Sequence, residues 1–132
     1  MRLKDKVAIV TGSGAGIGRA TAELFAKEGA RVVVAELEEP GGTETVDLIK
    51  KAGGQALFHR TDVSDRKSVA LMVDAAAKSY GAIDVLVNNA AAFVFGKVEE
   101  VTEEQWARVF GVNVIGYANC VAAALPHMKR AG

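Results

Sequence analysis

Short apolar segments alternate with amphipathic segments along the whole chain. The apolar segments are four to six residues long, and the first, at residues 7–10, is mostly β-branched, which is typical of a strand buried on both faces of a parallel sheet. The amphipathic segments repeat their apolar residues at helical spacing. We therefore predict strands at residues 7–10, 30–35, 55–60 and 83–87, and helices at residues 19–28, 43–52, 65–80 and 103–128.

Turn and capping residues mark several of these boundaries. A loop through residues 40–42 is expected before the second helix, because it contains one proline and two glycines. Ser64 is the predicted N-cap of the third helix, with Asp65 in its first turn. We expect Pro126 to end or kink the last helix. The spacing of Thr102 and Gln105 predicts a capping box at the start of this last helix. The apolar face of the helix is expected to carry Trp106, Phe110, Asn113, Tyr117, Cys120 and Ala124.

Strands that alternate with helices predict an α/β fold. The pattern βαβαβαβα requires right-handed crossovers and a parallel sheet with helices on both faces. We expect residues 1–132 to form one Rossmann-like, doubly wound domain with the strand order 3-2-1-4. Ligands of such sheets bind beyond the carboxyl ends of the strands. Gly12, Glu36, Asp62 and Asn89 each follow one predicted strand, so we expect them at the same edge.

The first strand leads into a glycine-rich turn, TGSGAGIG, at residues 11–18. Glycine permits a sharp turn and lets backbone lie close to a ligand. The helix that follows offers free N–H groups and the positive end of its dipole to an anion. A strand, a glycine turn and a helix in this order predict a pyrophosphate cradle. The alternative is a structural glycine turn in another α/β fold.

Composition narrows the choice of partners and location. The formal net charge is zero and no basic run occurs, which argues against nucleic acid and anionic membranes. A single cysteine, Cys120, excludes an internal disulfide and fits a cytoplasmic protein. His59 and His127 have no metal-ligand spacing, so we expect no metal site. We also expect no secretory signal and no segment long and apolar enough to span a bilayer.

Four motifs occur in a fixed order: Thr11-Gly12-x-x-x-Gly16-Ile17-Gly18, Asp62-Val63, Asn88-Asn89-Ala90-Ala91, and Asn113 within VNVIG. Together they resemble the short-chain dehydrogenase/reductase family, classical type. The resemblance spans the whole chain and departs from the Asn-Asn-Ala-Gly motif only at Ala91. It implies an oxidoreductase that transfers a hydride between a nicotinamide cofactor and an alcohol or carbonyl compound.

The resemblance also assigns roles to individual residues. It implies that Asn113 is the one member of the catalytic set in this chain, holding a water connected to a lysine. It implies cofactor binding by Gly12, Ser13, Gly14, Gly16, Ile17, Gly18, Glu36, Leu37, Asp62, Val63, Asn89, Ala90 and Ala91.

Glu36 predicts which nicotinamide cofactor is bound. A carboxylate after the second strand can accept hydrogen bonds from both ribose hydroxyls of the adenosine, and it would repel a 2′-phosphate. Relatives of the NADP type carry a basic residue in the glycine turn or after this strand, but residues 13–15 are uncharged and Leu37 follows Glu36. We therefore expect NAD rather than NADP. Glu38 and Glu39 leave open the alternative of a solvated acidic loop.

Other assignments keep a structural alternative. Asp62 is expected to receive the adenine amino group, to act in the cap of the following helix, or to do both. Asn89 can tie neighbouring strand ends, for example at Thr11, as well as it can contact a ligand. The amide of Asn113 needs a partner, which backbone or water can supply. The methyl group of Ala91 is expected to impair cofactor fit slightly.

The catalytic serine and the Tyr-x-x-x-Lys motif of the family are not among these 132 residues. Tyr80 is followed four residues later by Asp84, and Tyr117 by Val121, so neither starts that motif. We therefore expect an N-terminal cofactor-binding half, truncated before strand 5, without turnover of its own. The alternatives are a non-catalytic module that binds NAD or forms oligomers, and a structural remnant that binds nothing well.

A missing fifth strand would leave two apolar surfaces uncovered. The strand at residues 83–87 would become an edge, which is prone to pair with another chain. The last helix would expose an apolar stripe that includes Trp106, Phe110 and Tyr117. We therefore expect a homo-oligomer formed through the strand at 83–87, the helix at 103–128, or both.

Overall fold

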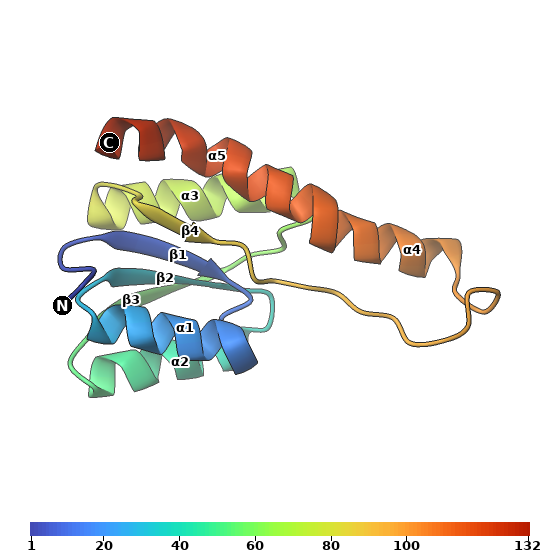
Figure 1. Cartoon of the computed structure of the whole chain (residues 1–132), viewed down its shortest axis with the longest axis horizontal. Coiled ribbons are helices and arrows are strands. Elements are labelled where there is room, and N and C mark those ends of the chain that lie inside the picture. Colours follow the sequence, from blue (N-terminus) through green and yellow to red (C-terminus); the bar gives the residue numbers. More distant parts are fainter.

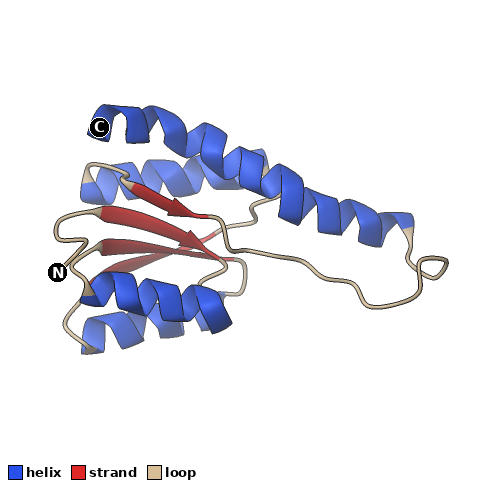
Figure 2. Ribbon diagram, viewed as in Figure 1, coloured by secondary structure: helices blue, strands red, loops and turns tan.

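The computed structural model describes all 132 residues and contains one parallel sheet between two layers of helices (Figures 1 and 2). Its strands are β1 (Val7–Thr11), β2 (Arg31–Glu36), β3 (Gln55–Arg60) and β4 (Val85–Val87). Their order is β3-β2-β1-β4, and every neighbouring pair is parallel. The predicted α/β fold and strand order are therefore confirmed.

Different helices cover the two faces of the sheet, each over its own apolar core (Figure 1). Ile9 and Val33 belong to the core under α3 (Arg66–Tyr80) and α5 (Gly116–Ala131). Ala8 and Val10 belong to the core under α1 (Gly16–Lys27) and α2 (Glu39–Lys51). This alternation of strand residues between two apolar cores explains why the strand segments are continuously hydrophobic. The helix α4 (Glu103–Phe110) and a π-helical turn η1 (Gly111–Ile115) precede α5 in the chain.

The start of α2 differs from the expected loop. The helix begins at Glu39, so Pro40, Gly41 and Gly42 belong to its first turn. Proline is tolerated there because its fixed φ suits a helix and its missing N–H has no helical acceptor. A Cβ at Gly42 would collide with the ring of Phe58, and one at Gly41 would meet the Gly14 carbonyl oxygen at 2.7 Å. These glycines allow close packing, and the loop prediction was wrong.

Three other boundaries also differ from the prediction. Asp65, not Ser64, caps α3, because its carboxylate accepts the N–H of Lys67 at 3.0 Å. Helix α1 begins at Gly16, three residues before the predicted start at residue 19. Strand β4 covers only Val85–Val87, and the preceding Asp84 instead receives the N–H of Val7 on its carboxylate at 2.8 Å.

The last helix combines a confirmed start with an unexpected middle. Thr102 and Gln105 form the predicted capping box. Pro126 does not end the helix, which continues to Ala131. The π-helical turn η1 adds a residue per turn and shifts the phase between α4 and α5. Among the residues expected on one face, Trp106, Phe110 and Tyr117 are exposed or half-buried, whereas Cys120 and Ala124 are fully buried.

The continuous helix Glu103–Ala131 contradicts the expectation that no segment is long and apolar enough to span a bilayer. By length and composition alone it could cross a membrane, with a mean hydropathy of 1.5 over 18 residues. Val112, Cys120 and Ala124 of this helix lie in the core that it shares with α3. Its apolar composition therefore has a partial explanation in the packing of the domain.

We predict that Gly18→Ala destabilises the domain by about 1–3 kcal/mol, the usual cost of overpacking. Gly18 is buried, and a Cβ there would collide with the carbonyl oxygen of Gly12 and lie 2.5 Å from Nδ2 of Asn89. Urea denaturation followed by circular dichroism measures the change. Gly111→Ala is the matched control, because its Cβ would make an ordinary 3.5 Å contact with Ser64. Equal stability of the two variants would contradict the prediction.

Candidate functional site

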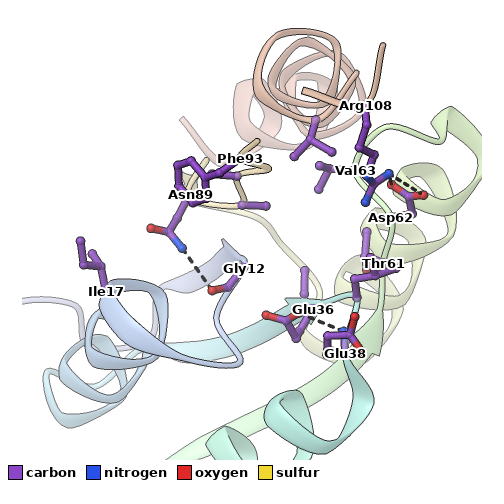
Figure 3. Close-up of a pocket in the computed structure, with 15 residues that line it drawn as sticks. Gly12, Ile17, Glu36, Glu38, Thr61, Asp62, Val63, Asn89, Phe93 and Arg108 are labelled. Atoms are coloured by element: carbon purple, nitrogen blue, oxygen red, sulfur yellow. Dashed lines mark hydrogen bonds and ion pairs between the residues drawn. The ribbon is translucent and has the colours of Figure 1, made fainter. Parts of the chain in front are cut away.

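A cavity of about 420 Å³ lies beyond the carboxyl ends of the strands (Figure 3). The residues that follow all four strands contribute to its wall. The predicted cofactor residues that line it are Gly12, Ile17, Glu36, Leu37, Asp62, Val63, Asn89, Ala90 and Ala91. Six further residues complete the wall, namely Ala35, Glu38, Thr61, Phe93, Arg108 and Val112. The expected convergence at one edge of the sheet is thus present.

Thr11 and Asn89 tie the ends of β1 and β4 together. The hydroxyl oxygen of Thr11 accepts the N–H groups of Asn89 at 2.9 Å and Ala90 at 3.0 Å. The side-chain amide of Asn89 donates to the carbonyl oxygens of Thr11 and Gly12, both at 3.1 Å. Asn89 therefore has the strand-tying role that we considered, and the tie fixes the first residue of the glycine turn.

The glycine turn is held from behind and leaves its helical N–H groups free. Gly12 and Gly16 have φ values of 65° and 54°, in the left-handed region that favours glycine. The N–H groups of Ile17 and Gly18 have no acceptor within the chain. Ser13 is buried, and its hydroxyl donates to the Val10 carbonyl at 2.6 Å, so this side chain faces the protein. The turn can therefore offer backbone donors to an anion.

The carboxylate of Glu36 is fixed by two backbone donors. One oxygen accepts the N–H of Gly14 and the other accepts the N–H of Glu38, both at 2.9 Å. A Cβ at Gly14 would lie 2.5 Å from Cγ of Glu36, so only glycine allows this contact. Each carboxylate oxygen can accept more than one hydrogen bond. Glu36 is therefore oriented and retains acceptor capacity toward the cavity (Figure 3).

Arg19, the basic residue that directly follows the glycine turn in the sequence, does not line the cavity. Its guanidinium donates to the Gly14 carbonyl at 2.6 Å and to the Thr45 hydroxyl at 2.9 Å. It also forms an ion pair with Glu44 at 3.2 Å. Thr45 in turn donates to the carbonyl of Ser13 at 2.7 Å. These contacts brace the turn against α2.

Asp62 lies on the other side of the cavity from Gly12, next to Ser64 and Arg108 (Figure 3). Its Oδ1 accepts the hydroxyl of Ser64 at 2.6 Å and the backbone N–H of Ser64 at 3.0 Å. Burial raises the pKa of Asp62, but the Ser64 hydrogen bonds and the Arg108 guanidinium outweigh it and leave the pKa below its ordinary value. The side chain is therefore an ionised hydrogen-bond acceptor at neutral pH.

The sequence did not reveal Arg108 as a cavity residue. Its Nη1 lies 3.4 Å from each carboxylate oxygen of Asp62 and 3.2 Å from the Ser64 hydroxyl. Arg108 belongs to α4 and lies 46 residues after Asp62 in the sequence. No local motif links the two positions, so only the fold brings them together.

Asn113 lies outside this cavity. Its amide oxygen accepts the N–H of Ala92 at 2.9 Å, and its amide nitrogen donates to the Ala92 carbonyl at 2.8 Å. It borders an apolar groove of about 370 Å³ that Phe93, Phe95 and Trp106 also line. The amide thus has the backbone partner that we considered as its structural role.

Four predicted residues support the cavity wall instead of lining it, namely Ser13, Gly14, Gly16 and Gly18. Ala91 lines the cavity and does not have a positive φ, so its backbone does not require glycine. Burial raises the pKa of the Cys120 thiol to about 11, which suits a core residue. No group of three His, Cys, Asp or Glu side chains is arranged to hold a metal.

Comparison with known proteins assigns the chain to a family. Residues 6–132 match the family model described as short chain dehydrogenase. The chain is 42% identical over 132 residues to an uncharacterized oxidoreductase of Methylorubrum extorquens, covering 99% of this chain and 53% of that protein. It is 43% identical over 129 residues to a cis-4-hydroxycyclohexanecarboxylate dehydrogenase of Sinomonas cyclohexanicum, covering 97% of this chain and 51% of that protein. The chain thus spans about half the length of these curated relatives.

A solved structure is also similar to this fold. A short chain dehydrogenase/reductase of Burkholderia phymatum in complex with NAD superimposes with a TM-score of 0.93 at 40% identity, covering 97% of this chain and 46% of that one. The sequence match and the fold agree. The chain belongs to the short chain dehydrogenase family.

Proposed function

We propose that these residues are the NAD-binding portion of an oxidoreductase that transfers a hydride between the nicotinamide and an alcohol or carbonyl compound. The observation that carries the proposal is a single cavity that joins the glycine turn, Glu36 and Asp62. The NAD complex of the Burkholderia phymatum relative supports the cofactor class. The whole protein's activity is part of the proposal, because the chain spans about half of its relatives.

The groups around the cavity fit the parts of a dinucleotide. The free N–H groups of Ile17 and Gly18, at the start of a helix without acidic residues in its first turn, suit the pyrophosphate. Glu36 suits the ribose hydroxyls. The Asp62 carboxylate is an acceptor for the adenine amino group, and the neighbouring Val63 has an N–H without an acceptor in the chain. When bound, the nicotinamide supplies the hydride chemistry.

The charges near the ribose position favour NAD over NADP. Glu36 and Glu38 both line the cavity, whereas Arg19 is occupied by Glu44 and the Gly14 carbonyl. A 2′-phosphate would therefore face carboxylates without a free cation, and such like-charge contacts cost several kcal/mol. Gly14 permits the Glu36 position that creates this repulsion.

We propose that the 132 residues do not turn over substrate by themselves. Proton transfer at the alcohol oxygen needs a group with a suitable pKa beside the substrate. Burial raises the pKa of Tyr80 even though the Arg31 guanidinium opposes this effect. Tyr80 also packs near Arg31, which begins β2 at the amino-terminal edge of the sheet. Neither Tyr80 nor Tyr117 starts a Tyr-x-x-x-Lys motif, so the acid and base would come from other residues of the protein.

We predict that Glu36→Gln weakens NAD binding by about tenfold and reduces the preference for NAD over NADP. The change removes a charged acceptor, and hydrogen bonds to charged groups contribute about 1.5–3 kcal/mol. Calorimetric titration of the chain with NAD and with NADP measures both affinities. Glu99→Gln is the control, because it makes the same charge change at an exposed site outside the cavity. NAD binding unaffected by Glu36→Gln would exclude Glu36 as the ribose-binding residue.

A second proposal concerns assembly: we infer that the chain forms a homo-oligomer through its last helix. Six apolar side chains on this helix are at least 41% exposed, namely Trp106, Phe110, Val114, Ile115, Val121 and Leu125. Strand β4 pairs only with β1, and the buried side-chain oxygen of Asn88 near this edge has no hydrogen-bond partner. Exposed apolar patches and free strand edges are typical sites of association.

We also propose a cytoplasmic location, because the one cysteine, Cys120, is buried and forms no disulfide.

We predict that multi-angle light scattering finds a dimer or larger species at micromolar concentration, and that Phe110→Glu shifts it toward monomer. A charge at this 55% exposed position would be buried without a partner in the assembly. Leu71→Glu is the matched control on α3, because Leu71 is also an exposed apolar residue but lies outside the proposed surface. A monodisperse monomer of the unaltered chain would refute the oligomer.

A further inference from the structure

Arg108 and its contacts are not explained by the binding roles described above. It is the one Lys or Arg side chain that lines the cavity, and its guanidinium lies against the Asp62 carboxylate (Figure 3). The side chains of both residues are substantially exposed, 45% for Arg108 and 34% for Asp62. Exposed ion pairs contribute about 0–1 kcal/mol to stability. The contact therefore has little value as a stabilising salt bridge.

The hydrogen bonds at Asp62 divide its two oxygens into different roles. Oδ1 accepts two donors of Ser64 and is close to Arg108 as well. Oδ2 has only the 3.4 Å contact with Arg108. Because Arg108 also donates to the Ser64 hydroxyl at 3.2 Å, the three groups form one cluster with a defined orientation. Within this cluster, Oδ2 keeps free acceptor capacity beside the cavity.

The same long helix also fixes the residue next to Asp62. The amide of Asn119 donates to the Val63 carbonyl at 3.0 Å, and Asn119 is 8% exposed. A Cβ at Gly116 would lie 2.7 Å from Cγ2 of Val63, so glycine permits the helix to approach this closely. Thus α4 contacts the side chain of Asp62, and α5 contacts the carbonyl of Val63.

We propose that Arg108 is a positioning residue for base recognition, which holds the Asp62 carboxylate so that Oδ2 is directed toward the exocyclic amino group of adenine. This inference rests on the proposed NAD site. An ionised carboxylate only accepts hydrogen bonds, so it favours a base with an amino group at C6 and disfavours one with a carbonyl there. Arg108 acts through Asp62 and increases the discrimination between the two bases.

The test compares NAD with nicotinamide hypoxanthine dinucleotide, which carries a carbonyl in place of the adenine amino group. Calorimetric titration of the 132-residue chain gives the ratio of the two dissociation constants. The unaltered chain should prefer NAD. Arg108→Met should weaken NAD binding by about fivefold to tenfold, the size of one lost hydrogen bond, with little change for the hypoxanthine analogue. The ratio should therefore fall by about the same factor.

Two further variants separate positioning from general charge and from folding. Arg108→Lys should restore part of the ratio, because lysine keeps the charge but lacks the planar fork of donors. Arg66→Met removes an exposed arginine on α3 that does not line the cavity, so it should leave both affinities unchanged. The thermal unfolding midpoint of each variant is measured alongside the affinities.

The possible failures are distinguishable. If Arg108→Met leaves the ratio unchanged, or weakens both dinucleotides equally, the positioning role is overturned while the NAD site stands. If the unaltered chain binds neither dinucleotide, the proposed function fails and the role of Arg108 fails with it. A fall in the NAD preference with an unchanged unfolding midpoint supports the inference.

Discussion

The structure depends on how the chain satisfies its backbone groups where β1 and β4 end. The Thr11 hydroxyl accepts two N–H groups of the segment after β4, and the Asn89 amide donates to the carbonyls of Thr11, the last residue of β1, and Gly12. A buried group left without such a partner would cost about 1–3 kcal/mol. Gly18 packs against the same Gly12 carbonyl without room for a Cβ. The tie therefore also fixes where α1 begins and where its free N–H groups lie.

The position of the site could be predicted because it follows from periodicity and handedness alone. Four apolar segments separated by helices permit few topologies, and right-handed crossovers bring the ends of the strands to one edge. Gly12, Asp62 and Asn89 follow strands and Glu36 is the last residue of β2, and all four line the same cavity. Their chemistry was equally visible, because glycine, carboxylate and amide groups have distinct hydrogen-bonding capacities.

The details that escaped prediction depend on contacts between distant segments. Glycines at the start of α2 suggested a loop, although Gly42 is needed because the Phe58 ring packs against it. The π-helical turn at Gly111–Ile115 interrupts the last helix, and no local pattern in the sequence predicted it. Arg108 and Asn119 lie 46 and 56 residues from the partners that they hold, Asp62 and Val63. Such pairs belong to the tertiary structure and leave no spacing signal in one sequence.

The distribution of charge in the cavity gives the proposed dinucleotide a direction. Three carboxylates line the wall, those of Glu36, Glu38 and Asp62, and Arg108 is the one cation among the lining residues. Arg108 lies against the Asp62 carboxylate, away from the glycine turn (Figure 3). The negative pyrophosphate is then best accommodated at the first turn of α1, which has no acidic residue. In the proposed site, backbone donors would take the place of a basic side chain, and the carboxylates would bind the hydroxyl and amino groups of the adenosine, which are hydrogen-bond donors.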